Sequence, residues 1–199
     1  MTAPRLHAHE LACQRGDRLL FRALSFALEG GDILHVTGAN GTGKTTLMRA
    51  LAGLTTPFAG TVACEGARGL LDERTALDPD LPLGRALAFW RRLDAGGDGG
   101  EVRARLALDA LLDVPVRYLS TGQRKRAGIA VLLARGVPIW LLDEPLSGLD
   151  HAAIALVQEI IAGHARGGGI AVIASHQPLG LDSVVTLALE DHRPQVDAV

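Results

Sequence analysis

A glycine-rich stretch in the first quarter of the chain has the residue types needed to bind a row of phosphates. Residues 38–45 read GANGTGKT, which fits the pattern G-x-x-x-x-G-K-[ST] of a P-loop between an apolar run and a helical pattern. Glycine lets backbone N–H groups close around phosphate oxygens, and the start of a helix adds positive potential. The predicted phosphate-binding residues are Gly38, Ala39, Asn40, Gly41, Thr42, Gly43, Lys44, Thr45 and Thr46.

Two side chains of this stretch are predicted to take part in chemistry. Lys44 would reach the β- and γ-phosphates and support catalysis, and the hydroxyl of Thr45 would be a ligand of Mg²⁺. A glycine-rich turn that fits the pattern by chance is the alternative interpretation. The strand before the stretch and the helix after it favour the phosphate site.

A pair of acids ends a second apolar run, PIWLLDEP at 138–145. Apolar residues followed by an acid at the carboxyl end of a strand are typical of a Walker B site, so we predict that Asp143 holds Mg²⁺ directly or through water. Glu144 is predicted to orient and deprotonate the attacking water. Two solvated acids at a strand end are the alternative, which the P-loop earlier in the chain disfavours.

Histidines occur in two settings. His176 follows a third buried run, in ASHQP, and is predicted to contact the γ-phosphate because the carboxyl ends of such strands face the ligand. A structural histidine is the alternative. His7 and His9 share one face of a predicted strand, but two ligands without a third are weak support for a metal site.

The stretch YLSTGQRKR at 118–126 raises a different question. Ser120 and Thr121 are typical of a helix start, Gly122 follows, and three cations come soon after. Helix starts attract anions, yet the stretch has no acid and no nucleophile paired with a base. It therefore predicts a phosphate site with no catalytic group of its own.

The elements around these motifs predict an α/β fold. Helix 44–54 is expected to place Leu47, Leu51 and Leu54 on one face and to stop near Gly53. The middle of the chain is predicted to be helical with a flexible joint at 95–100. Of Phe89 and Trp90, we expect one in the core and one in contact with a partner protein. Strands are predicted at 32–38, 60–66, 69–72, 138–145, 169–176 and 184–190, and helices at 44–54, 81–94, 101–113, from 120 to about 135, and 151–165.

Composition narrows the classes of function. The 199 residues suit one domain, and 48% of them are hydrophobic. The net charge of −2 argues against a nucleic-acid partner. Cys13 and Cys64 have no metal-binding spacing and are expected to be buried reduced thiols. We find no signal-peptide pattern and no segment able to span a bilayer, so we expect a cytoplasmic protein.

The order of P-loop, LSTGQ, LLDEP, SGLD and SH resembles that of the ATP-binding subunits of ABC transporters over nearly the whole chain. The resemblance implies a P-loop NTPase (RecA-like) core with an antiparallel β edge and an inserted helical subdomain. It implies one ABC ATPase domain over 1–199, with the core at about 1–73 and 129–199 and the helical subdomain at 74–128. It also implies ATP and Mg²⁺ as ligands, and His176 as the switch histidine.

The same resemblance answers the question of the helix start. In that family, two subunits sandwich two ATP molecules head to tail, and each signature motif, here LSTGQ, addresses the nucleotide held by the other subunit. Ser120, Gly122 and Gln123 would then bind the partner's nucleotide, with Asp150 of SGLD at the seam. The implied partners are a second copy of the chain and an integral membrane permease that touches the helical subdomain. The implied location is the cytoplasmic face of the bacterial inner membrane.

Two positions depart from the family pattern. Where the family places an aromatic residue that stacks on adenine, this chain has Arg15, whose guanidinium can also stack on a base. The family's glutamine between the P-loop and the signature is missing, and Glu73 or Arg74 stands near its place. Glu73 could bind a cation, whereas Arg74 could not.

Within the family, three stretches look most like the ATPase subunit of the haem exporter of bacterial cytochrome c maturation. They are CQRGDRLLFRALSF, LSTGQRKR and SHQPL. Three alternatives stay open at this point: the ATPase of another small exporter, an ABC ATPase that acts on DNA or ribosomes, and a head that senses ATP without cleaving it. Intact Lys44, Asp143, Glu144 and His176 oppose the last of these.

Overall fold

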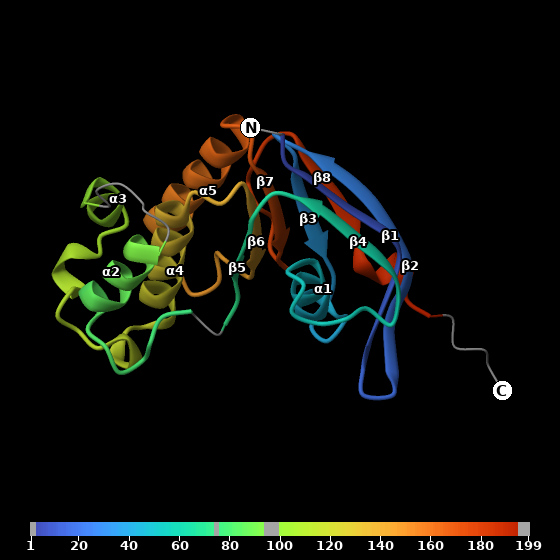
Figure 1. Ribbon diagram of the computed structural model, residues 1–199, viewed down its shortest axis with the longest axis horizontal. Coiled ribbons are helices and arrows are strands. Elements are labelled where there is room, and N and C mark those ends of the chain that lie inside the picture. The colour runs from blue at the N-terminus through green and yellow to red at the C-terminus, as the bar shows by residue number, and fades with distance from the viewer. Residues whose placement is uncertain (1–2, 74–75, 94–99, 195–199) are drawn as a thin grey trace.

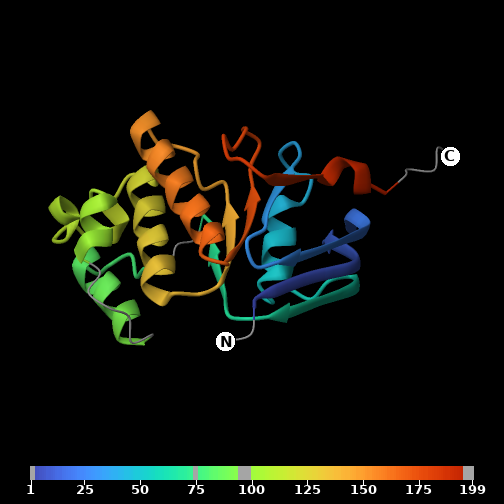
Figure 2. The same cartoon turned by 90° about the horizontal axis from the view of Figure 1, so that it is seen from above.

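The computed structural model describes residues 3–73, 76–93 and 100–194. A group of helices lies at one end and two β-sheets lie at the other (Figure 1). Seen from above, the helices, the parallel sheet, helix α1 and the antiparallel sheet follow one another as layers (Figure 2). The predicted α/β core with an antiparallel edge and helices inserted in the chain is confirmed.

The antiparallel sheet has the strand order β2-β1-β4. Strand β1 (Arg5–Arg15) pairs with β2 (Arg18–Glu29) through a tight hairpin, in which Arg15 is opposite Arg18, and with β4 (Ala59–Glu65). Buried and exposed residues alternate over the first half of β1, from Arg5 to His9, as expected for a sheet with one face toward the core. The hairpin turn brings Arg15 to the end of the sheet.

The parallel sheet has the strand order β5-β6-β7-β3-β8. Every residue of its inner strands β6 and β7 is buried, which explains their continuous apolar sequences. Because all neighbouring pairs are parallel, the carboxyl ends of the strands lie at one edge. The strands are β3 (Ile33–Thr37), β5 (Arg68–Leu71), β6 (Ile139–Asp143), β7 (Ile170–Ala174) and β8 (Val184–Ala188).

The helices divide between the two sides of the parallel sheet. Helix α1 (Lys44–Leu51) lies between the sheets, and the others lie on the opposite side (Figure 2). These are α2 (Leu83–Leu93), α3 (Gly100–Arg105), α4 (Thr121–Arg135) and α5 (His151–Arg166), with the short 3₁₀ turns η1 (Asp109–Leu111) and η2 (Val116–Tyr118); a further turn, η3 (Leu189–His192), follows β8.

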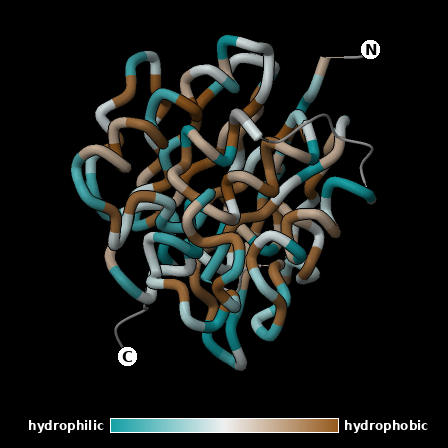
Figure 3. The backbone as a smooth tube through the Cα atoms, turned by 90° about the vertical axis from the view of Figure 1, so that its left-hand side faces the viewer, coloured by the Kyte–Doolittle hydropathy of each residue, from teal (hydrophilic) through white to brown (hydrophobic). Residues whose placement is uncertain are grey.

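Two hydrophobic clusters form the core, one on each face of the parallel sheet. Alternate residues of β6 serve different clusters: Trp140 and Leu142 pack with the helices, while Ile139 and Leu141 pack with α1 and the antiparallel sheet. This is the period-two pattern of a strand buried on both faces. Seen from the helical end, hydrophobic segments fill the interior and hydrophilic ones lie mainly at the rim (Figure 3).

Two helix predictions were too long. Helix α1 ends at Leu51, so Leu54 lies beyond it and is 66% exposed, whereas Leu47 and Leu51 are fully buried. The chain turns at Gly53, whose φ of +76° ends the helix. The helix predicted over 101–113 ends at Arg105, and residues 109–111 form only a 3₁₀ turn.

Other expectations for the middle of the chain had mixed outcomes. Trp90 packs on the core, as predicted for one of the pair, and donates its indole N–H to the Ala76 carbonyl oxygen at 3.0 Å. Phe89 is 55% exposed. The predicted joint at 95–100 lies, apart from residue 100, outside the described residues, as does Arg74. Both cysteines are free thiols; Cys13 is buried, as predicted, but Cys64 is only partly so.

Candidate nucleotide-binding and catalytic site

The loop between β3 and α1 is built around glycine. Gly43 is the N-cap residue of α1, has φ of +112°, and offers no side chain to cap the helix. A Cβ atom at this position would lie 3.1 Å from Leu20, so the loop also packs closely on β2. The first N–H groups of a helix have no partner within it, and those of α1 are left without a side-chain cap. They are suited to phosphate oxygens.

The side chains of Lys44 and Thr42 hold the backbone of this loop. The Lys44 side chain is buried, and its Nζ donates to the carbonyl oxygen of Gly38 at 2.7 Å and lies 3.8 Å from Glu144 Oε1. The Thr42 hydroxyl donates to the Ala39 carbonyl oxygen at 2.9 Å. The ammonium group therefore lies between the loop and the predicted catalytic acid.

Glu190, which follows β8, also supports the loop. Its Oε1 accepts a hydrogen bond from the backbone N–H of Ala39 at 3.0 Å. No motif pointed to this residue. The signal available in the sequence was an acid directly after the run VVTLAL, because a side chain there lies at the same edge of the sheet as the P-loop.

Asp143 and Thr45 meet below the loop. Asp143 ends β6, is 5% exposed, and accepts a hydrogen bond from the Thr45 hydroxyl at 2.6 Å between oxygens. Burial raises the pKa of the Asp143 carboxyl, and the hydrogen bond from Thr45 acts in the opposite direction. A carboxylate beside a hydroxyl supplies the oxygen ligands that Mg²⁺ prefers, so this pair fits the cation.

Glu144 stands at the centre of the site. Its carboxylate oxygens both lie 3.0 Å from His176 Nδ1, and its backbone N–H donates to the Ala174 carbonyl oxygen at 2.8 Å. Its φ of +49° is a left-handed conformation that residues other than glycine rarely adopt. The structure thus brings together Lys44, Glu144 and His176, as predicted from three separate stretches.

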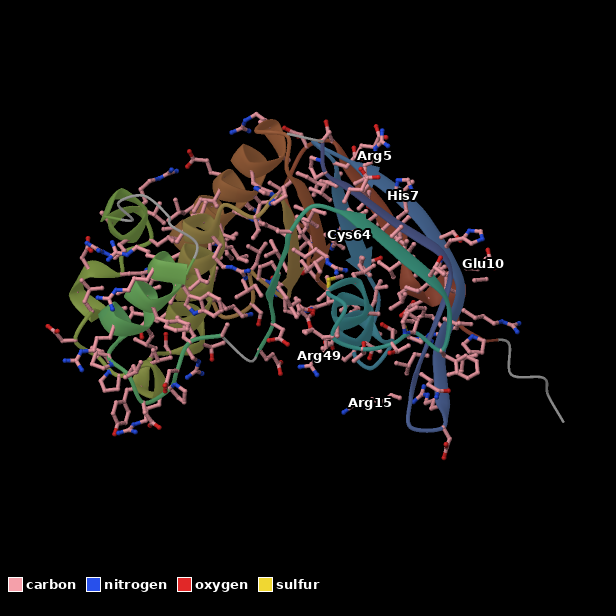
Figure 4. The ribbon with its side chains drawn as sticks, viewed as in Figure 1. Arg5, His7, Glu10, Arg15, Arg49 and Cys64 are labelled. Atoms are coloured by element: carbon pink, nitrogen blue, oxygen red, sulfur yellow. The ribbon has the colours of Figure 1, made fainter. Side chains whose placement is uncertain are left out.

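Two hollows adjoin these residues, and both are lined by Asn40, Glu73 and Glu144. Arg15 reaches the first hollow from the β1–β2 hairpin, on the side where α1 lies (Figure 4). The other residues of the first hollow are Leu20, Gly41, Gly43, Lys44, Thr45, Thr46 and Asp143. The second is completed by Asp72, Thr121, Arg124, Lys125, Ser147 and His176.

The start of α4 differs from the start of α1. Ser120 and Gln123 form a capping box: Ser120 Oγ accepts from the Gln123 N–H at 3.2 Å, and Gln123 Oε1 accepts from the Ser120 N–H at 2.8 Å. Gly122 packs so tightly on the SGLD loop that a Cβ atom there would lie 2.7 Å from the Gly148 carbonyl oxygen. Asp150 caps α5 by accepting from the Ala153 N–H at 2.8 Å. None of Ser120, Gly122, Gln123 and Asp150 lines either hollow.

Comparison with known proteins decides the family. A family model described as "ABC transporter" matches residues 21–147. The chain belongs to the ABC transporter family. It is 57% identical to the "Cytochrome c biogenesis ATP-binding export protein CcmA" of Novosphingobium aromaticivorans, over 95% of this chain and 97% of that protein. It is 50% identical to the protein of the same name from Zymomonas mobilis, over 94% and 85% of the two chains.

A solved structure confirms the ABC fold. It is described as the ATP binding subunit of an ABC transporter and aligns with a TM-score of 0.81 at 20% identity, over 92% of this chain and 86% of that one. The prediction of an ABC transporter ATP-binding subunit, most like those of cytochrome c biogenesis, is confirmed by these relatives.

Two further features of the described residues concern metal binding and membrane insertion. No group of three or more histidines, cysteines and acids in the described part of this ABC protein could hold a metal ion, and His7 points away from the sheet into solvent (Figure 4). None of the helices within the described ranges combines the length and hydrophobicity that crossing a membrane requires.

Proposed function

We propose that this chain is the ATP-hydrolysing subunit of an exporter complex required for c-type cytochrome biogenesis, with haem as the exported group. The observation that carries the proposal is that Lys44, Glu144 and His176 meet beside the Asp143–Thr45 pair. The chain in which they meet is 57% identical to a protein named as a cytochrome c biogenesis export protein. Hydrolysis converts ATP and water to ADP and phosphate.

Catalysis in this proposal depends on how the residues of the site position the phosphates and the attacking water. The α1 start and the P-loop N–H groups bind the phosphates, and Lys44 moves from Gly38 toward the γ-phosphate. Thr45 and Asp143 would hold Mg²⁺, which supplies neutralisation of the phosphate charge. Glu144 accepts a proton from the attacking water, and His176, which contacts both of its carboxylate oxygens, orients it. Arg15, which lines the first hollow from the hairpin, would stack on the base.

The proposal includes two protein partners. A second copy of the chain would bind head to tail, with Ser120, Gly122 and Gln123 addressing the partner's nucleotide and Asp150 at the seam. An integral membrane permease would contact the helical subdomain, residues 74–128, where Phe89 and Tyr118 are exposed. The subunit would then lie at the cytoplasmic face of the inner membrane, with no nucleic acid involved. The core of the domain would comprise residues 1–73 and 129–199.

The test is made in the source organism. The gene is deleted, and membrane proteins are stained for covalently bound haem after complementation with the wild-type chain or with Lys44→Ala. We expect c-type cytochromes to disappear on deletion and to return only with the wild type. Persistence of the cytochromes would overturn the haem assignment and leave the ATPase of another small exporter. Rescue by Lys44→Ala would show that ATP use is dispensable.

A further inference from the structure

Lys125 is a buried cation on α4 to which no sequence motif gives a role. It is 8% exposed, and its Nζ donates a hydrogen bond to the main-chain carbonyl oxygen of Glu144. Burial lowers the pKa of the Lys125 ammonium, while the negative charges of Glu144, Asp143 and Glu73 act in the opposite direction. A buried lysine with this bond is tied to the catalytic acid through its backbone.

The backbone of Glu144 needs such support. Its left-handed φ of +49° is unfavourable for a residue with a Cβ atom and persists only where neighbouring groups hold it. Its N–H is held by Ala174, and its carbonyl oxygen accepts from the Ser147 N–H at 3.3 Å in addition to Lys125. This backbone conformation sets where the Glu144 side chain starts, and its carboxylate contacts His176.

Lys125 also belongs to the first turns of the signature helix. It lies four residues after Thr121, about one turn along α4, and Thr121, Arg124 and Lys125 line the same hollow as Glu144 and His176. A helix behaves as a rigid element over such a distance, so a shift at its capped start moves Lys125 and the carbonyl group that it holds.

We propose that Lys125 is a positioning residue that holds Glu144 in its catalytic orientation and conveys to it the engagement of the α4 start with the partner's nucleotide. The proposal rests on the ATPase function proposed above. In each dimer, the signature motif of one subunit would then have two effects. It would contact the nucleotide bound by the other subunit, and it would adjust the position of Glu144, the general base, in its own subunit.

Steady-state phosphate release by the full chain tests this role in Lys125→Met and Lys125→Arg. We expect kcat to fall about tenfold to a hundredfold in Lys125→Met with KM for ATP within about twofold, because a misplaced base slows the chemical step without weakening binding. Lys125→Arg keeps a donor and should recover most of the rate. Equal rates for Lys125→Met and the wild type would overturn the proposal.

Arg126→Met is the matched control. Arg126 is the next residue of α4, and its Nη1 also donates to a main-chain carbonyl oxygen, that of Leu106, at 2.9 Å, away from the site. Its kcat should stay within about twofold of the wild type. A similar loss of kcat in both variants, with matching falls in melting temperature, would mean that the Lys125 bond is only structural. If Lys125→Met does not fold, Lys125→Gln, which keeps a shorter donor, is measured in its place.

Glu144→Gln separates this proposal from the proposed function. If Lys125 acts through Glu144, adding Lys125→Met to Glu144→Gln should cause no further loss in single-turnover phosphate release, and the double variant should still dimerise with ATP on gel filtration. A further tenfold loss, or failure to dimerise, would overturn the positioning role. Wild-type phosphate release by Glu144→Gln alone would instead overturn the assignment of Glu144 as the base.

Discussion

The starts of helices α1 and α4 are built from similar residues, but they differ in whether side chains cap their backbone N–H groups. At α1, Gly43 provides no side-chain cap, and the loop before it lies against Lys44 and Glu144. At α4, Ser120 and Gln123 satisfy each other in a capping box. The first N–H groups of α1 have no side-chain cap, whereas the start of α4 is capped by its own side chains.

The difference shows how binding divides between the two starts. Because the start of α1 has no side-chain cap, its N–H groups are suited to binding nucleotide within a single chain. A ligand at α4 can bind the N–H groups of Thr121 and Gly122 and the donors that the cap leaves on the Ser120 hydroxyl and the Gln123 amide, so it must add to an existing cap. A weaker, conditional contact of this kind suits a site that forms only when a second chain arrives.

The largest expected effect comes from a substitution in the site beside the start of α1 that leaves the start of α4 unchanged. Glu144→Gln removes the proposed general base but keeps the shape of the side chain, so we expect phosphate release to fall at least about a hundredfold. Nucleotide binding should persist, and an ATP-bound dimer should accumulate on gel filtration. Unchanged phosphate release would contradict the assignment of Glu144.

The next effect comes from the α4 side. Ser120→Asp keeps a good N-cap and adds a negative charge where the partner's phosphate would lie, so ATPase activity should fall about tenfold to a hundredfold without loss of melting temperature. Ser120→Asn keeps the cap without the charge and is the control, expected to stay much closer to the wild type. Equal activity of the two variants would place the nucleotide elsewhere.

Mixing two inactive variants sharpens the same prediction. Lys44→Ala lacks a working P-loop and Ser120→Asp lacks a working signature, yet their heterodimer contains one site with both intact. We expect the mixture to regain part of the activity that neither variant has alone. No recovery would argue against a head-to-tail arrangement.

A smaller effect is expected at Arg15, which borders the open α1 side. Arg15 is exposed, and an exposed cation–π contact contributes about 0.5–1 kcal/mol, so Arg15→Ala should raise KM for ATP about two- to fivefold. Arg15→Tyr should restore KM and favour ATP over GTP more strongly than the wild type does. An unchanged KM in Arg15→Ala would show that the guanidinium does not touch the base.

The smallest effect concerns the stability contributed by His164, which lies toward the opposite edge of the parallel sheet. A substitution there should leave the starts of α1 and α4 unchanged. His164 stacks on Trp140 with ring centroids 3.9 Å apart, and burial lowers its pKa. The unfolded chain takes up a proton near its ordinary pKa of about 6.5 while the folded chain resists it, so stability falls as pH drops below that value. His164→Phe keeps a ring on Trp140, and its melting temperature should fall less between pH 7.5 and 5.5.

The sequence was sufficient for features that depend on local pattern. The buried strands β6 and β7, the P-loop, and the meeting of Asp143 with Thr45 followed from apolar runs and motif order. Features that depend on packing between distant segments were missed. The contacts of Lys125 and Glu190 join residues 19 and 151 positions apart from their partners, and neither leaves a periodic signal. The stop of α1 near Gly53 was predicted correctly, whereas Leu54, which lies beyond that stop, was wrongly placed on the helix.

Glu144 shows how selection for rate can oppose selection for stability. Its left-handed backbone costs on the order of 1–2 kcal/mol relative to glycine, which adopts φ of +49° without strain. A chain chosen only to resist heat would therefore carry glycine or asparagine at this position and would lose its base. Stabilised variants obtained by screening for thermal tolerance, without a test of hydrolysis, would be expected to include inactive substitutions here.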